Sequence, residues 1–86
     1  MSDLSFPTSA ELLLAVVAAV TKAGGKASNK QIQEIVIKDL QLSPEHVAVI
    51  HSGNRSELEY RLAWARTNAK KKGLINSSGP RTWVLP

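Results

Sequence analysis

A long helix followed by a short hairpin is the feature of this sequence that most restricts its fold. Within residues 52–85, apolar residues recur at steps of four, three and four, at Leu58, Leu62, Ala65 and Ala69. At about 100° per residue these positions share one face, which predicts a helix that buries this face in a core. Gly73 ends the pattern, and two short apolar runs, 74–75 and 82–85, flank the turn-forming residues 76–81. We therefore predict a helix over residues 56–72 and a β-hairpin after it.

Two capping boxes mark the expected helices of the first half of the chain. In each box a Ser or Thr is followed three residues later by Glu or Gln, at residues 8–11 and 28–31. Such a pair satisfies backbone groups at the start of a helix. We therefore predict one helix from residue 8 or 9 to about 23 and a second from residue 28 to about 40.

Weaker signals complete the expected architecture. Ser43-Pro44 is an N-cap followed by proline, which predicts a short helix over residues 44–50. Residues 51–54 would form the turn into the long helix, and a brief strand at Lys26-Ala27 would add a third strand to the hairpin. The expected fold is mainly α with a small antiparallel β-hairpin, which is the winged helix-turn-helix architecture.

Composition argues against several classes of function. The chain has 86 residues, enough for one hydrophobic core, so we expect a single domain over residues 8–86 after a flexible arm of residues 1–7. It contains no cysteine and two histidines, so we expect no metal site, no cofactor and no catalytic residues. The longest apolar run, residues 12–20, is too short for a membrane span, which needs roughly 18 to 20 residues. The expected location is the cytoplasm, in association with the nucleoid.

Positive charge is concentrated in the second half of the chain. The net charge is +4, but residues 1–50 contain four lysines and five acids, whereas residues 51–86 contain seven Lys or Arg residues and two acids. The basic half is the one that contains the predicted long helix and hairpin. This asymmetry favours a nucleic-acid partner.

The predicted long helix carries aromatic, hydroxyl and cationic groups on the face opposite its core residues. In helix-turn-helix proteins the start of such a helix contacts base edges in the major groove, and basic residues around it contact phosphates. We therefore predict double-stranded DNA as the partner. The predicted DNA-binding residues are Lys30, Asn54, Arg55, Ser56, Tyr60, Lys70, Lys71 and Arg81.

Structural roles compete with binding roles for several side chains. Ser56 fits an N-cap, which is its stronger assignment. Arg61 and Arg66 flank the core face, so packing or ion pairing within the protein is expected of them. Trp64 and Trp83 could form a pocket for a methylated base, but a structural role is favoured for both, in bridging elements and covering the core.

A recognisable pattern runs through the second half of the chain, with SGNR at 52–55, RLAWART at 61–67, KKGLI at 71–75 and TWV at 82–84. It resembles the N-terminal winged-helix domain of Mrr-like restriction endonucleases, in which a Trp-Ala pair, two lysines and Gly-Leu-Ile precede the wing. The chain departs from the family's pattern at Asn54, which separates the glycine from the arginine. It also departs at Ala69, which is smaller than usual, and at Lys72, which replaces a small residue.

The resemblance implies a DNA-targeting module of a modification-dependent restriction system, without nuclease activity of its own. In family members a PD-(D/E)xK nuclease commonly accompanies this domain, so a fused or separate nuclease domain is an expected partner, and a homodimer is compatible with this reading. Two alternatives stay open. A stand-alone transcription regulator would use the same surface, whereas a winged-helix protein-interaction or dimerisation module would use Tyr60 and Trp64 as an apolar contact.

Overall fold

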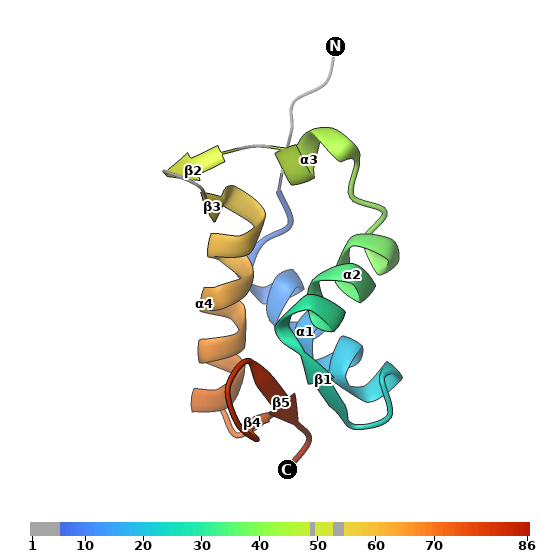
Figure 1. Ribbon diagram of the computed structural model, residues 1–86, viewed down its shortest axis with the longest axis vertical. Coiled ribbons are helices and arrows are strands. Elements are labelled where there is room, and N and C mark those ends of the chain that lie inside the picture. The colour runs from blue at the N-terminus through green and yellow to red at the C-terminus, as the bar shows by residue number, and fades with distance from the viewer. Residues whose placement is uncertain (1–5, 49, 53–54) are drawn as a thin grey trace.

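The computed structural model describes residues 6–48, 50–52 and 55–86. For residues 50–52 and 55 it describes the backbone alone. The elements are α1 (Ser9–Lys22), β1 (Lys26–Ser28), α2 (Asn29–Asp39), α3 (Pro44–Ala48), β2 (Ile50–Ser52), β3 (Arg55–Ser56), α4 (Glu57–Lys71), β4 (Asn76–Ser77) and β5 (Thr82–Val84). Figure 1 shows α1 behind α2 and α4, in contact with both, and the sheet of β1, β4 and β5 at one end. The chain is mainly helical with a small antiparallel sheet, the winged-helix fold class that the sequence predicts.

Local sequence determines where the helices begin and end. Capping boxes start three of them, pairing Thr8 with Glu11, Ser28 with Gln31 and Ser56 with Glu59. Gly24 follows α1 and Gly73 follows α4, each with a positive φ, of 94° and 76°. Both glycines donate their amides to carbonyls of the preceding turn, those of Thr21 and Lys70. These contacts satisfy backbone groups that helix ends otherwise leave unpaired.

The core lies where α1, α2 and α4 meet. Its largest fully buried side chains are aliphatic: Leu12, Val16, Val20, Ile32, Val36, Leu58, Leu62 and Ile75. The buried residues of α4 are Leu58, Leu62, Ala65 and Ala69, the four that share the predicted spacing. Burial of these groups is the main favourable contribution to packing. It also decides which face of α4 is turned away from the core.

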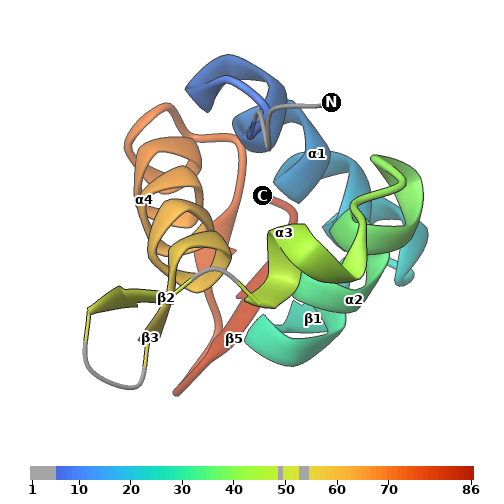
Figure 2. The same cartoon turned by 90° about the horizontal axis from the view of Figure 1, so that it is seen from above.

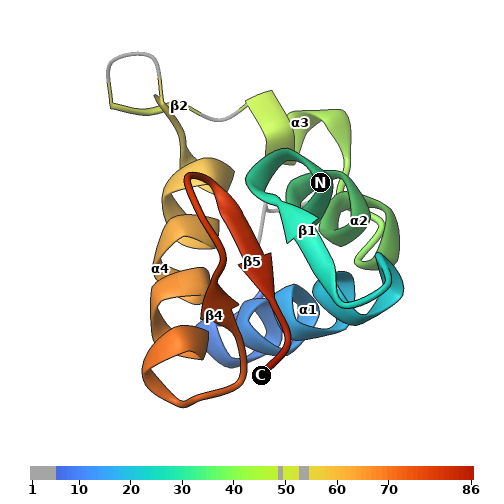
Figure 3. The same cartoon turned by 60° about the horizontal axis from the view of Figure 1, so that its bottom comes forward.

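The three-stranded sheet has β5 at its centre, paired antiparallel with β1 on one side and β4 on the other (Figure 3). The predicted third strand is therefore present, over Lys26–Ser28. The first strand of the wing hairpin was expected at residues 74–75 but lies at Asn76–Ser77. The reason is that Leu74 donates its amide to Ala69 in the cap of α4, and the Ile75 side chain is buried in the core.

The segment before α4 differs from the prediction. Helix α3 ends at Ala48 instead of residue 50. Strand β2, which pairs with β3, includes the last residue of the expected helix and the first two of the expected turn, whose residues 53–54 lie outside the described residues. Ile50 is β-branched and pairs with Ser56, and a five-residue helix has little cooperativity with which to retain such a residue. The resulting small hairpin projects beside the start of α4 (Figure 2).

Candidate nucleic-acid interface

The wing is joined to the start of α2 by two hydrogen bonds. The backbone amide of Asn29 donates to the carbonyl oxygen of Arg81 at 2.9 Å. The indole Nε1 of Trp83, on β5, donates to the side-chain Oδ1 of Asn29 at 2.7 Å. One residue at the first position of α2 thus holds both the wing loop and its returning strand. The wing therefore has a defined position relative to the helices.

Arg81 lies at the tip of this wing in an unusual backbone conformation. The loop of residues 78–81 is closed by a hydrogen bond from the Ser78 amide to the Thr82 carbonyl, at 2.9 Å. Within it Arg81 has a φ of 55°, in the left-handed region that costs a residue with a side chain roughly 1 kcal/mol or more. The side chain itself is exposed. A strained, exposed cation at a loop tip is a feature that invites a functional explanation.

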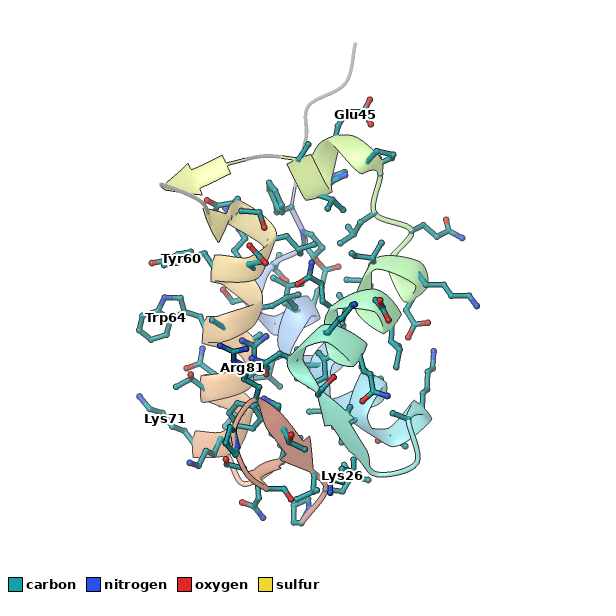
Figure 4. All side chains as sticks on the ribbon, viewed as in Figure 1. Lys26, Glu45, Tyr60, Trp64, Lys71 and Arg81 are labelled. Carbon is teal, nitrogen blue, oxygen red and sulfur yellow. The ribbon has the colours of Figure 1, made fainter. Side chains whose placement is uncertain are left out.

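A groove of about 840 Å³ opens between α2, α4 and the wing. We call it the cationic groove, and its lining residues are Ser28, Asn29, Lys30, Gln33, Glu34, Glu59, Arg66 and Arg81. Three separate elements thus each contribute one cation: Lys30 from α2, Arg66 from α4 and Arg81 from the wing. Figure 4 shows Arg81 in this position, between α4 and α2.

Two carboxylates limit where an anion could bind in the cationic groove. Glu59 belongs to the capping box of α4, where its Oε1 accepts from the Ser56 amide at 3.0 Å. Glu34 lies one turn after Lys30 on α2. Glu59 is two turns before Arg66 along α4, so the wing end of the groove, around Arg66 and Arg81, is the more positive part. An anion would be attracted most strongly there.

The predicted DNA-binding residues divide into several groups. Lys30 and Arg81 meet in the cationic groove, whereas Lys70 and Lys71 are exposed in the last turn of α4. Ser56 is the N-cap of α4, its Oγ accepting from the Glu59 amide at 3.1 Å, which confirms its structural assignment. The backbone of Arg55 forms strand β3, and Asn54 lies outside the described residues. Tyr60 is partly buried and lines other hollows of α4.

Residues 10–86 match the protein family described as the Mrr N-terminal domain. The chain belongs to this family. A comparison with curated proteins and one with solved structures gave no match. The match covers almost the whole chain and so includes the cationic groove and the wing.

The outward side of α4 carries a second surface in this Mrr N-terminal domain. We call it the aromatic face, and it is a shallow hollow of about 360 Å³ lined by Tyr60, Ala63, Trp64 and Thr67. Figure 4 shows Tyr60, Trp64 and Lys71 projecting together from this side of the helix. Trp64 is 51% exposed, so its ring is only partly covered. On its covered side it lines a smaller hollow with Ser9 and Leu12 of α1, which is compatible with the expected role in bridging α4 to another element. Trp83 also has the expected structural role.

Sequence reasoning missed Arg66 as a residue of the groove. The signal that could have found it is helical spacing, since Glu59, Arg66 and Lys70 recur at steps of seven and four and so share one side of α4. The expectation for Arg61 is confirmed. Its Nε pairs with Glu57 Oε2 at 2.6 Å, and its guanidinium lies 4.7 Å from the centre of the Phe6 ring.

Two further observations on the described residues concern metal ligands and membrane spans. No three His, Asp or Glu side chains among them are grouped so that they could hold a metal ion. Every helix in the described part of the chain is too short or too polar to cross a bilayer. His46 caps α3, with its Nδ1 2.8 Å from the hydroxyl of Ser43.

Proposed function

We propose that this domain binds double-stranded DNA and directs an Mrr-like restriction system to it, without cutting DNA itself. The observation that carries the proposal is the convergence of Lys30, Arg66 and Arg81 from three elements on one groove. Phosphates of a duplex lie in regular rows, so cations fixed by different elements can bind several of them together. The nuclease would come from a fused or separate domain, and the site of action would be the nucleoid in the cytoplasm.

The proposed binding mode follows from the positions of the outward side of α4, the last turn of α4 and the wing on the domain. Helix α4 would enter the major groove with its outward side, because that groove admits an α-helix. The wing would then rest on the neighbouring backbone, where Arg81 would contact phosphate. Lys70 and Lys71, exposed in the last turn of α4, would contact the phosphates that border the groove. Lys30 and Arg66, which share the cationic groove with Arg81, would contact the same stretch of backbone, so this mode brings five cations to phosphates.

A protein-interaction or dimerisation module is the second candidate, and the exposed ring of Trp64 supports it. Tryptophan is enriched at the energetically important centres of protein interfaces. Salt dependence separates the two candidates. Binding to phosphates weakens by roughly 0.9 log units per log unit of salt for each phosphate neutralised, whereas an apolar contact between proteins barely responds.

The proposal is tested by fluorescence-anisotropy titration of the chain with labelled duplexes between 50 and 300 mM salt. We expect binding that weakens steeply with salt, with a slope of about −4 to −5 if these five cations contact phosphates. Sedimentation of the chain alone over the same range measures self-association. Salt-independent self-association with no binding to any duplex at the lowest salt would overturn the proposal and favour the protein-interaction module. A transcription regulator would give the same slope, and co-purification of a nuclease distinguishes it.

A further inference from the structure

We propose that the aromatic face of α4 recognises the C5-methyl group of thymine in the major groove. This inference rests on the proposed function, because DNA must first bring its major groove to α4. It adds what the cationic groove cannot supply, since contacts to phosphates carry no sequence information. The inference concerns Tyr60, Ala63, Trp64 and Thr67, and the ligand is the methyl group of thymine.

The chemistry of the aromatic face favours a methyl group over a polar base edge. Direct reading of guanine or adenine requires Arg, Lys, Asn or Gln in a bidentate arrangement. The four lining side chains are instead a phenol ring, an indole ring, a methyl group and a threonine. Apolar contact from such groups is the usual way in which a protein detects the methyl group of thymine.

Thr67 strengthens this assignment. Its hydroxyl donates to the backbone carbonyl of Ala63, one turn earlier, at 3.0 Å. Because the hydroxyl donor is engaged within the helix, the group that Thr67 adds to an apolar contact is its methyl. Ala63 contributes a second methyl on the same side. Trp64 and Tyr60 then border these two small groups with the walls of a shallow hollow.

Charge favours DNA as the occupant. Lys71 projects from the same side of α4 as Tyr60 and Trp64 (Figure 4), and the cationic groove adjoins the other side of this helix. A polyanion attracted by these cations is therefore brought across the aromatic face. The major groove of DNA presents apolar methyl groups between two rows of phosphates. It therefore matches a face that combines apolar side chains with a neighbouring lysine.

The test begins by selecting tightly bound duplexes from a randomised pool with the wild-type chain. Each thymine in the selected site is then replaced, one at a time, by deoxyuridine, which lacks the C5-methyl group and keeps the same hydrogen-bonding edges. We expect at least one replacement to weaken binding about fourfold, the value of one buried methyl group. At that position a 5-methylcytosine pair is compared with a cytosine pair. A gain extends recognition to 5-methylcytosine, and the absence of a gain assigns it to thymine.

Two variants connect this effect to the aromatic face. Thr67→Ser keeps the hydroxyl and removes one methyl group. We therefore expect the ratio of the affinity for the thymine duplex to the affinity for the deoxyuridine duplex to fall by about half. Trp64→Ala should bring the ratio close to one while the salt slope stays unchanged. Lys70→Ala is the matched control, since it should weaken binding to both duplexes equally.

The outcomes separate this inference from the proposed function. If every deoxyuridine duplex binds as tightly as its parent, or if Trp64→Ala keeps the discrimination, the inference is overturned while salt-dependent DNA binding stands. If Trp64→Ala changes binding to no duplex at all, the aromatic face does not contact DNA and a protein becomes its occupant. If no duplex binds the wild-type chain, both the proposed function and this inference fail.

Discussion

At the scale of single residues, Arg81 combines backbone strain with an exposed charge. Its φ of 55° suits glycine, so Arg81→Gly should be more stable to unfolding than Arg81→Ala by roughly 1 kcal/mol, because glycine relieves the strain that alanine keeps. Both variants lack the guanidinium, and both should bind duplex DNA roughly three- to tenfold more weakly than the wild type. Urea denaturation measures the first effect and anisotropy the second. Equal stability of the two variants, or full DNA affinity in either, would contradict this account.

At the scale of elements, the end of α4 is the most basic segment of the described residues. Lys70 and Lys71 lie exposed in its last turn, near the negative end of the helix dipole, which they stabilise. We expect the double variant Lys70→Ala, Lys71→Ala to weaken binding to duplexes of any sequence. We also expect it to reduce the salt slope by about one to two units, as counterion release requires.

The matched control removes two lysines from the other half of the chain. Lys26→Ala with Lys38→Ala lowers the net charge by the same two units but leaves the end of α4 intact. Its salt slope should stay within experimental error of the wild-type slope. If both double variants lose slope equally, binding depends on net charge and the proposed surface is wrong.

At the scale of the whole molecule, the wing and the helices are joined through residues far apart in sequence. Trp83 and Asn29 are 54 positions apart, and their hydrogen bond is part-buried. Trp83→Phe keeps most of the ring but leaves Asn29 Oδ1 without this donor, so we expect a loss of about 1 to 2 kcal/mol. For a domain of this size the melting temperature should fall by roughly 4 to 15 °C, measured by circular dichroism.

Trp64→Phe is the control for this effect, because Trp64 is half exposed and faces away from the core. Its melting temperature should change by less than about 3 °C, as surface substitutions alter stability little. Equal losses in the two tryptophan variants would show that the indole of Trp83 has no special role in holding the wing.

The elements that the sequence predicted well are those specified by local chemistry. Helices α1, α2 and α4 begin at Ser or Thr caps. They end near residues that can adopt a left-handed backbone conformation or cap the last turn. Residues 50–52 were misassigned because a β-branched residue next to a short helix can continue the helix or pair as a strand. Whether residue 50 is helical or part of a strand depends on the pairing of Ile50 with Ser56, and this pairing cannot be inferred from the neighbouring sequence alone.

The candidate site was predictable in its charges but not in its arrangement. Sequence alone identified Lys30, Lys70, Lys71 and Arg81 as basic residues of a winged helix, and the asymmetry of charge that favours DNA. It could not show that Arg66 shares a groove with Lys30 and Arg81, since three elements must pack before these side chains meet. It also could not show the exposure of Trp64, which depends on what packs beside α4.

The sequence by itself therefore determined the approximate boundaries of α1, α2 and α4, the buried face of α4, the fold class and the family. These properties depend on interactions between residues three or four positions apart and on the periodicity of apolar side chains, both of which are readable along the chain. Tertiary structure alone decided the position of the wing, the composition of the cationic groove and the exposure of the aromatic face. Each of these depends on contacts between distant segments, such as the hydrogen bonds from Asn29 to Arg81 and from Trp83 to Asn29. Such contacts form only when the core has packed, because burial of the core residues sets the distances between the elements that carry them.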